Sequence, residues 1–199
     1  MEQKLKREPL GKGFYVNVTP HHTFGTDAVV LRHFANPKIK DKLVDLGTGC
    51  GIIPLLLLKN KTADRVTGVE IQPAAAKIAE ENARLNQIQD NFAVINCDMK
   101  EIKANAPSGA FDLVTCNPPY KIAGGGSQNL SEAQRIARHE IKCVFADVVA
   151  AAKHLLKFGG FLCICHRPER LADIICEMRA QNIEPKVLRE VIQREGKEP

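Results

Sequence analysis

Four consecutive residues near the middle of the chain could do chemistry together: Asn117, Pro118, Pro119 and Tyr120. An Asn side-chain oxygen and a proline carbonyl are two acceptors, which suits an amino group that carries two N–H donors. Two prolines also remove two backbone donors, so nearby carbonyls can face a ligand. The Tyr ring offers a flat stacking surface. These residues favour binding of a planar amino group, and the alternative interpretation is a Pro-Pro turn that only ends a strand.

A glycine-rich turn upstream has the spacing Asp45-x-Gly47-x-Gly49-x-Gly51. A dinucleotide-binding turn would place its third glycine at position 52, which is Ile52. The Asp45 carboxylate would repel a phosphate at short range but attract an ammonium group. The turn therefore favours a cofactor with a zwitterionic amino-acid tail and no phosphate.

Two further carboxylates complete this interpretation. Glu70 lies 19 residues after Gly51, a suitable distance for a side chain that accepts the hydroxyl groups of a ribose. Asp98 can accept the exocyclic amine of an adenine, or it can cap a helix. An ammonium, a ribose and an adenine amine, each met by an acceptor, describe S-adenosylmethionine. The predicted cofactor residues are Asp45, Gly47, Thr48, Gly49, Gly51, Glu70, Ile71, Asp98, Met99 and Asn117, and no metal ligand is assigned.

The elements that must position these residues alternate along the chain. Expected strands cover residues 14–18, 43–46, 66–70, 92–97, 111–116, 161–165 and 186–193. Expected helices cover residues 26–34, 52–58, 74–86, 131–157 and 168–181, with Gly159 and Gly160 ending the fourth. This order predicts a Rossmann-like α/β fold with a doubly wound, mostly parallel sheet. Ligands of such sheets bind at the carboxyl ends of the strands, and each candidate side chain lies at one.

Composition narrows the class of protein. A length of 199 residues favours one domain, and the net charge of +5 is compatible with a nucleic-acid partner. Seven scattered cysteines without a C-x-x-C pair indicate reduced thiols and a cytoplasmic location. No apolar run long enough for a membrane span and no signal peptide are visible. The adjacent His21 and His22 diverge, so we expect a loop there rather than a metal site.

The two motifs together resemble the class I S-adenosylmethionine-dependent methyltransferases that act on a planar amino nitrogen. Residues 24–28 (Phe-Gly-Thr-Asp-Ala), residues 136–140 (Ile-Ala-Arg-His-Glu) and residues 155–160 are most similar to the bacterial tRNA1(Val) (adenine(37)-N6)-methyltransferase family. The resemblance implies transfer of a methyl group to N6 of an adenine in RNA, tRNA in particular. It also implies that Asn117, Pro118, Pro119 and Tyr120 are the catalytic residues, which hold the amino group and stack on the extruded base.

Two alternatives remain open: a release-factor glutamine-N5 methyltransferase, and a non-catalytic methyltransferase-fold module that binds RNA or a partner. The chain lacks the Tyr-Glu-Pro-like segment expected of a glutamine enzyme. RNA contacts are expected from basic residues, and Arg135 and Arg138 could instead form a solvated helix face. These basic residues are Lys4, Lys6, Arg7, Lys121, Arg135 and Arg138. The oligomeric state is not predicted.

The expected domain organisation has two parts. Residues 1–40 form a basic segment whose short strand and helix pack over the cofactor site, and residues 41–199 form the methyltransferase domain. Enzymes of this family usually end in an antiparallel hairpin of a sixth and a seventh strand. Here the chain stops at Pro199, where the turn into the seventh strand would begin. We therefore expect a truncated hairpin, or a sheet edge that is closed in another way.

Overall fold

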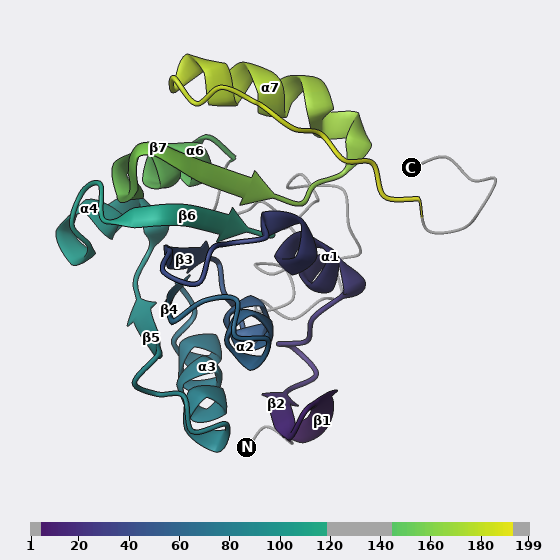
Figure 1. Ribbon diagram of the computed structural model, residues 1–199. Coiled ribbons are helices and arrows are strands. Elements are labelled where there is room, and N and C mark those ends of the chain that lie inside the picture. The colour runs from purple at the N-terminus through teal and green to yellow at the C-terminus, as the bar shows by residue number, and fades with distance from the viewer. Residues whose placement is uncertain (1–4, 119–144, 193–199) are drawn as a thin grey trace.

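The computed structural model describes residues 5–118 and 145–192, and its centre is a five-stranded parallel sheet in the order β5-β4-β3-β6-β7 (Figure 1). The strands are β3 (Lys42–Leu46), β4 (Arg65–Glu70), β5 (Phe92–Asn96), β6 (Phe111–Cys116) and β7 (Leu156–Ile164). The chain moves outward from β3 to one edge and then returns to β6 on its other side. This change of direction is the switch point at which α/β sheets bind ligands. The expected Rossmann-like, mostly parallel sheet is confirmed.

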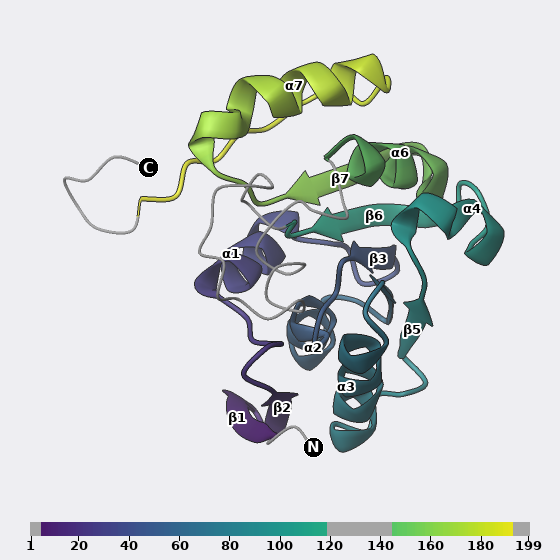
Figure 2. The same ribbon diagram turned by 180° about the vertical axis from the view of Figure 1, so that it is seen from behind.

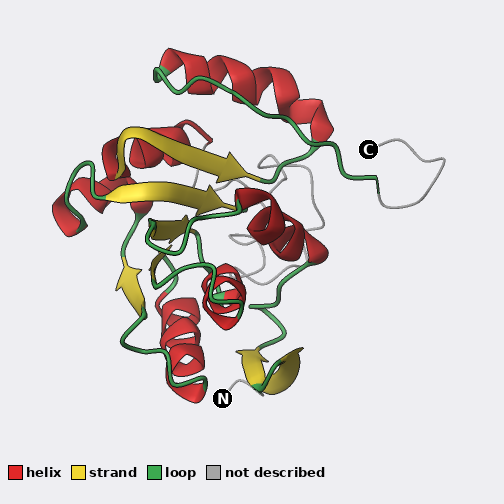
Figure 3. Ribbon diagram, in the orientation of Figure 1, coloured by secondary structure: helices red, strands yellow, loops and turns green. Residues whose placement is uncertain are grey.

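Helices cover both faces of the sheet (Figure 3). On one face lie α1 (Thr26–Ala35), α2 (Ile52–Lys59) and α3 (Pro73–Leu85). On the other lie α4 (Ile102–Asn105), α6 (Phe145–Leu155) and α7 (Leu171–Ala180), with the short 3₁₀ turns η1 (Met99–Glu101) and η2 (Pro168–Arg170). Each face has its own apolar cluster, and α2 buries seven of its eight residues. Helix α2 can therefore hold the glycine turn that precedes it against a rigid core.

The N-terminal residues form a hairpin of β1 (Lys6–Gly11) and β2 (Phe14–Val18), which lies beside α3 (Figure 2). The sequence predicted β2 but not β1. The backbone groups of Tyr15 bond to the side chain of Asn86 rather than to β1. Pro9 pairs opposite Tyr15, so its missing N–H breaks no ladder bond. Val16 is fully buried and anchors the hairpin in the apolar cluster under α2.

One expected boundary is wrong. The helix ends at Leu155, and β7 begins at Leu156 and runs through both Gly159 and Gly160. The register between β6 and β7 shifts at these glycines, because Phe111 pairs with Leu156 whereas Leu113 pairs with Phe161. A Cβ atom at Gly160 would lie 3.0 Å from a backbone oxygen of β6, so this glycine permits a close approach of two strands instead of ending a helix.

The expected strand at residues 186–193 is also wrong for its described part, because residues 186–192 form no strand. A strand requires a neighbouring strand for its backbone hydrogen bonds, and none of the described strands pairs with this segment. Val187 and Leu188 are largely exposed, while the Arg189 guanidinium lies 5.3 Å from the ring centre of Phe34 in α1. The apolar and β-branched residues of this segment therefore did not suffice to form a strand here.

Two composition-based expectations can be compared with the described residues. No disulfide links the six cysteines in that part of the chain, and the seventh, Cys143, lies outside it. Within residues 5–118 and 145–192, no helix has the length and apolar character needed to cross a bilayer.

Candidate active site

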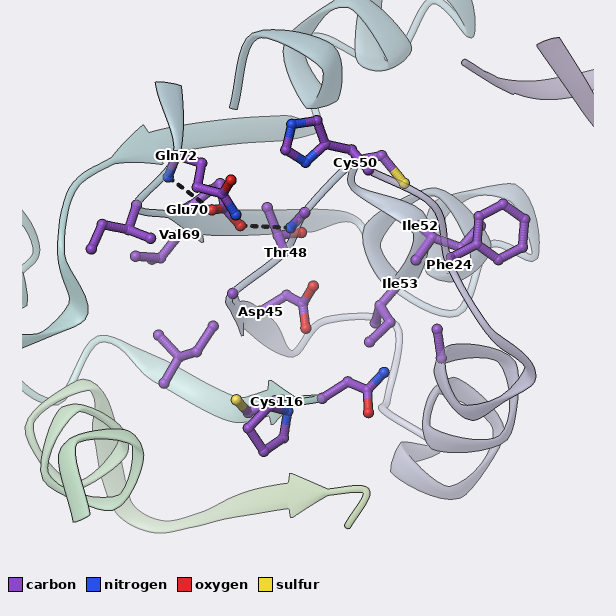
Figure 4. Close-up of a pocket in the computed structure, with 18 of the residues that line it drawn as sticks. Phe24, Asp45, Thr48, Cys50, Ile52, Ile53, Val69, Glu70, Gln72 and Cys116 are labelled. Atoms are coloured by element: carbon purple, nitrogen blue, oxygen red, sulfur yellow. Dashed lines mark hydrogen bonds between the residues drawn. The ribbon is translucent and has the colours of Figure 1, made fainter. Parts of the chain in front are cut away.

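A pocket opens at the carboxyl ends of β3, β4 and β6, with the segment after β5 forming a further wall (Figure 4). The predicted cofactor residues that line it are Asp45, Gly47, Thr48, Gly49, Glu70, Ile71, Asp98, Met99 and Asn117. Pro118 lines it as well, whereas the predicted Pro119 and Tyr120 lie outside the described residues. The topology thus brings together side chains from four strand ends.

The glycine turn between β3 and α2 depends on backbone conformations that other residues rarely adopt. Gly47, Gly49 and Gly51 have φ values of 68°, 58° and 82°. Gly51 differs from the other two because it does not line the pocket; a Cβ there would lie 2.7 Å from the ring of Phe92. Gly51 therefore has a packing role, because it lets α2 begin close to the sheet, and its contact with the cofactor stays a prediction.

Asp45 lies in β3 with 1% of its surface exposed, and its carboxylate points into the pocket (Figure 4). Burial raises the pKa of Asp45 to about 7, and the nearby Glu70 adds to the rise. The hydroxyl of Thr115 opposes this pKa shift by donating a 2.6 Å hydrogen bond to Asp45. The Thr48 hydroxyl also lowers the pKa but falls short of hydrogen-bond geometry and is buried without a partner. An ammonium group here would stabilise the ionised carboxylate and bring its pKa down.

Glu70, at the end of β4, joins the glycine turn to the following helix. Its carboxylate accepts hydrogen bonds from the backbone N–H of Gly49 at 2.9 Å and from that of Gln72 at 2.8 Å (Figure 4). Burial raises the pKa of Glu70, and the backbone N–H groups of Gln72, Gly49 and Ile71 oppose the rise. A carboxylate has about four acceptor positions, so Glu70 keeps acceptor capacity for a ribose hydroxyl beside these backbone donors.

Asp98 fulfils the capping alternative that the sequence left open. Its side chain accepts from the backbone N–H of Lys100 at 3.0 Å and so caps η1. The same residue lines the pocket, and its carboxylate has further acceptor positions. Capping and contact with an adenine amine are therefore compatible.

Residues 21–25 form one wall of the pocket; residues 1–40 were expected to pack over the cofactor site, but no individual residue of this loop was predicted to line it. His22 is buried, and burial, with His21 beside it, lowers its pKa and favours the neutral ring. Phe24 adds an apolar side chain to the same wall (Figure 4). The similarity of residues 24–28 to the methyltransferase family is the sequence feature that could have indicated this wall. Side-chain spacing alone could not place an N-terminal loop beside β3.

Asn117 follows directly after β6, next to the buried Pro118. Asn117 is half-buried and lines the same pocket as Asp45. Thr115 of β6 pairs with Asp45 of the neighbouring strand β3. Asn117 therefore lies two residues further along the chain than the residue that pairs with Asp45. The acceptor pair proposed for an amino group therefore adjoins the position proposed for the cofactor tail.

A doubly wound sheet with this glycine turn and these strand-end acceptors defines a class I methyltransferase. The chain belongs to the methyltransferase small domain family, whose model matches residues 23–181. It is therefore an S-adenosylmethionine-dependent methyltransferase. The family resemblance noted from the sequence is confirmed.

Curated relatives carry a narrower name. The tRNA1(Val) (adenine(37)-N6)-methyltransferase of Aeromonas hydrophila is 30% identical over 175 residues, which are 87% of this chain and 72% of the relative. The protein of the same name from Porphyromonas gingivalis is 31% identical over 182 residues, 88% of this chain and 70% of the relative. Among solved structures, a predicted O-methyltransferase from Agrobacterium tumefaciens has a TM-score of 0.59 at 22% identity. It covers 76% of this chain and 66% of that one, and it shows the shared fold alone.

Proposed function

We propose that this chain transfers a methyl group from S-adenosylmethionine to the exocyclic N6 of an adenine in tRNA. The observation that carries the proposal is the position of Asn117 and Pro118 in the wall of the pocket that also contains Asp45 and Glu70. The two curated relatives named above support the choice of an adenine in tRNA.

The cofactor would lie across the strand ends, with each polar part facing an acceptor. The Asp45 carboxylate would take the ammonium group, and the Glu70 carboxylate would accept from the ribose hydroxyls. Asp98 would accept the adenine amine, and Ile71, which is 36% exposed, would give its base an apolar surface. The bound cofactor supplies a methyl group on a positively charged sulfur.

The acceptor nitrogen needs positioning because its lone pair is delocalised into the adenine ring. The side-chain oxygen of Asn117 and the carbonyl of Pro118 would accept its two N–H groups and favour a pyramidal nitrogen. The lone pair would then point at the methyl carbon. This contribution is orientation and electrostatic stabilisation of the transition state, without a side-chain nucleophile or a metal. Tyr120, outside the described residues, would stack on the extruded base.

Residues 1–40 would complete the site as a basic segment over the cofactor. The wall formed by residues 21–25 supports this division of the chain. Lys6 and Arg7 of the hairpin are both exposed, so phosphate contacts are accessible to them. Lys6 also pairs with Glu8 at 2.8 Å, so part of its charge is already compensated.

A methyl-transfer assay tests the function directly. Labelled cofactor is offered with bulk tRNA, with double-stranded DNA and with a release factor under the same conditions. We expect label in tRNA, digestion to N6-methyladenosine, and a steep loss of tRNA affinity as salt rises, because phosphate contacts release counterions. Tyr120→Ala should weaken tRNA binding by about 1–3 kcal/mol with little change in that salt dependence.

The same assay separates the alternatives. Label in the release factor would assign a glutamine methyltransferase, whose peptide substrate has no phosphate charge. Cofactor and tRNA binding without turnover would assign a binding module instead.

A further inference from the structure

The amide side chain of Asn82 in α3 connects two parts of the molecule that are far apart in sequence. Its oxygen accepts from the backbone N–H of Asn17 at 2.7 Å, and its nitrogen donates to the Asn17 carbonyl at 3.0 Å. The same nitrogen donates to the carbonyl of Cys50 at 2.9 Å. Asn82 is fully buried, so both amide hydrogens and the oxygen are committed to the hairpin and to the glycine turn.

The Cys50 carbonyl needs a donor from outside its own helix. Cys50 precedes Gly51, the N-cap residue of α2, and the residue four positions further on is Pro54, which has no N–H. Cys50 is itself 2% exposed, so its carbonyl could not readily exchange the amide for water. Leaving such a carbonyl unpaired is costly.

The glycine turn depends on such external bonds, because three glycines with positive φ carry little conformational preference of their own. The backbone N–H groups of Gly47 and Thr48 are held by the Val69 carbonyl, at 2.9 and 3.0 Å, and that of Gly49 by Glu70. These bonds hold the first part of the turn against β4. Asn82 holds the last part from the opposite side, through α3.

We propose that Asn82 is a positioning residue for methyl transfer, whose amide fixes the cofactor-binding turn through the Cys50 carbonyl and couples that turn to the N-terminal hairpin. This inference rests on the proposed position of the cofactor at the turn. The hairpin lies outside the pocket, since the described lining residues begin at His21. The coupling therefore runs through α3 and not through a ligand that touches both parts.

Asn86 provides a matched control one helical turn away. Its side chain accepts from the Tyr15 N–H at 2.8 Å and donates to the Tyr15 carbonyl at 2.7 Å, which repeats the contact of Asn82 with Asn17. Its side-chain nitrogen also donates to the backbone oxygen of Asn82, one turn earlier in the chain. Asn82→Ala removes a hairpin contact and the turn contact, whereas Asn86→Ala removes a hairpin contact with no loss at Cys50.

The experiment measures S-adenosylhomocysteine affinity by calorimetry, and KM for the cofactor with kcat, at a temperature where both variants are folded by circular dichroism. We expect Asn82→Ala to raise the dissociation constant and the cofactor KM about tenfold or more, with a smaller change in kcat. Asn86→Ala should change the dissociation constant less than about twofold. Equal effects of the two variants would reduce Asn82 to a hairpin anchor and overturn the inference.

A second measurement uses the unaltered chain and does not depend on folding of a variant. Coupling is reciprocal, so S-adenosylhomocysteine should slow hydrogen exchange of the backbone amide of Asn17 severalfold. Protection confined to residues 45–51, with the hairpin unchanged, would overturn the coupling. If the unaltered chain binds no S-adenosylhomocysteine, the proposed cofactor site fails instead, which distinguishes the two failures.

Discussion

The hydroxyl of Thr115 donates a 2.6 Å hydrogen bond to the carboxylate of Asp45, and each residue has only 1% of its surface exposed. The two residues are partners in the parallel register of β3 and β6. The bond therefore joins the strand that carries the proposed ammonium acceptor to the strand that ends at Asn117. The bond also lowers the pKa of Asp45 and so favours the ionised carboxylate, the form that would bind an ammonium group.

Cofactor affinity should depend on pH through Asp45. Its pKa of about 7 in the folded chain means that this carboxyl is partly neutral near neutrality, and an ammonium group requires the ionised form. Affinity for S-adenosylhomocysteine should rise up to about tenfold per pH unit below 7 and level off above it. Glu70, with a raised pKa, and His22, with a lowered pKa, face the same pocket and broaden the transition. Calorimetry from pH 6 to 8 measures the profile, and a flat profile would contradict this role.

Folding stability should show the opposite sign. The pKa of Asp45 rises from 3.8 to about 7 on folding, so the folded chain binds this proton more tightly than the unfolded chain does. The stabilisation that this proton gives the folded chain is fully present below about pH 4 and is lost as pH rises through about 7.

Thr115→Val removes the hydroxyl that lowers the pKa of Asp45, so the pH midpoint of cofactor binding should move to higher pH. Thr115→Ser keeps the hydroxyl and should leave the midpoint near that of the unaltered chain.

Glu70→Ala should weaken cofactor binding by about 1–3 kcal/mol, because the ribose hydroxyls and the Gly49 N–H both lose an acceptor. The unliganded chain should also unfold at a lower temperature, since Glu70 holds the turn to β4. Glu80→Ala is the control: Glu80 forms an exposed pair with Arg84 at 3.3 Å, and such pairs contribute little. Thermal unfolding with and without S-adenosylhomocysteine measures both effects. Equal cofactor-induced shifts in the two variants would argue against the assignment of Glu70.

Asn117→Ala should lower kcat roughly 100-fold or more while cofactor affinity changes much less, because its amide acts on the transferring nitrogen. Asn105→Ala removes an exposed amide that donates to the backbone carbonyl of Glu101 in η1, and it should leave kcat unchanged. Single-turnover assays with tRNA separate chemistry from binding. Chelators should have no effect on turnover. A fully active Asn117→Ala variant, or chelator-sensitive turnover, would reject the proposed mechanism.

Gly68→Ala should destabilise the fold by about 1–3 kcal/mol, since a Cβ on β4 would lie 2.6 Å from the methyl carbon of Thr48. The same clash should weaken cofactor binding by moving the glycine turn. Adding Thr48→Ser removes that methyl and should recover part of the stability. Gly25→Ala, whose Cβ would meet its nearest atoms at 3.9 Å, is the tolerated control. Urea unfolding of all four chains measures the differences, and an absence of rescue would show that Thr48 is not the obstacle.

The sequence by itself determined the order of the elements and the chemistry at the strand ends. Short apolar runs alternating with helical segments require a parallel sheet, and parallel strands place their carboxyl ends at one edge. Asp45, Glu70, Asp98 and Asn117 were therefore predictable as neighbours from the sequence, and the structure places them around one pocket. The glycines at 47, 49 and 51 were likewise recognisable, because positive φ demands them.

Only the tertiary structure decided the features that depend on contacts between distant segments. The strand through Gly159 and Gly160 pairs with β6, whereas no strand in the described part of the chain pairs with residues 186–192. Gly51 differs from Gly47 because Phe92 of another strand packs against it. Asn82 reads in sequence as an ordinary helical residue, and its three bonds exist because α3 lies between the hairpin and the turn. Local pattern specifies the elements, and burial against particular neighbours decides which polar groups act in the site.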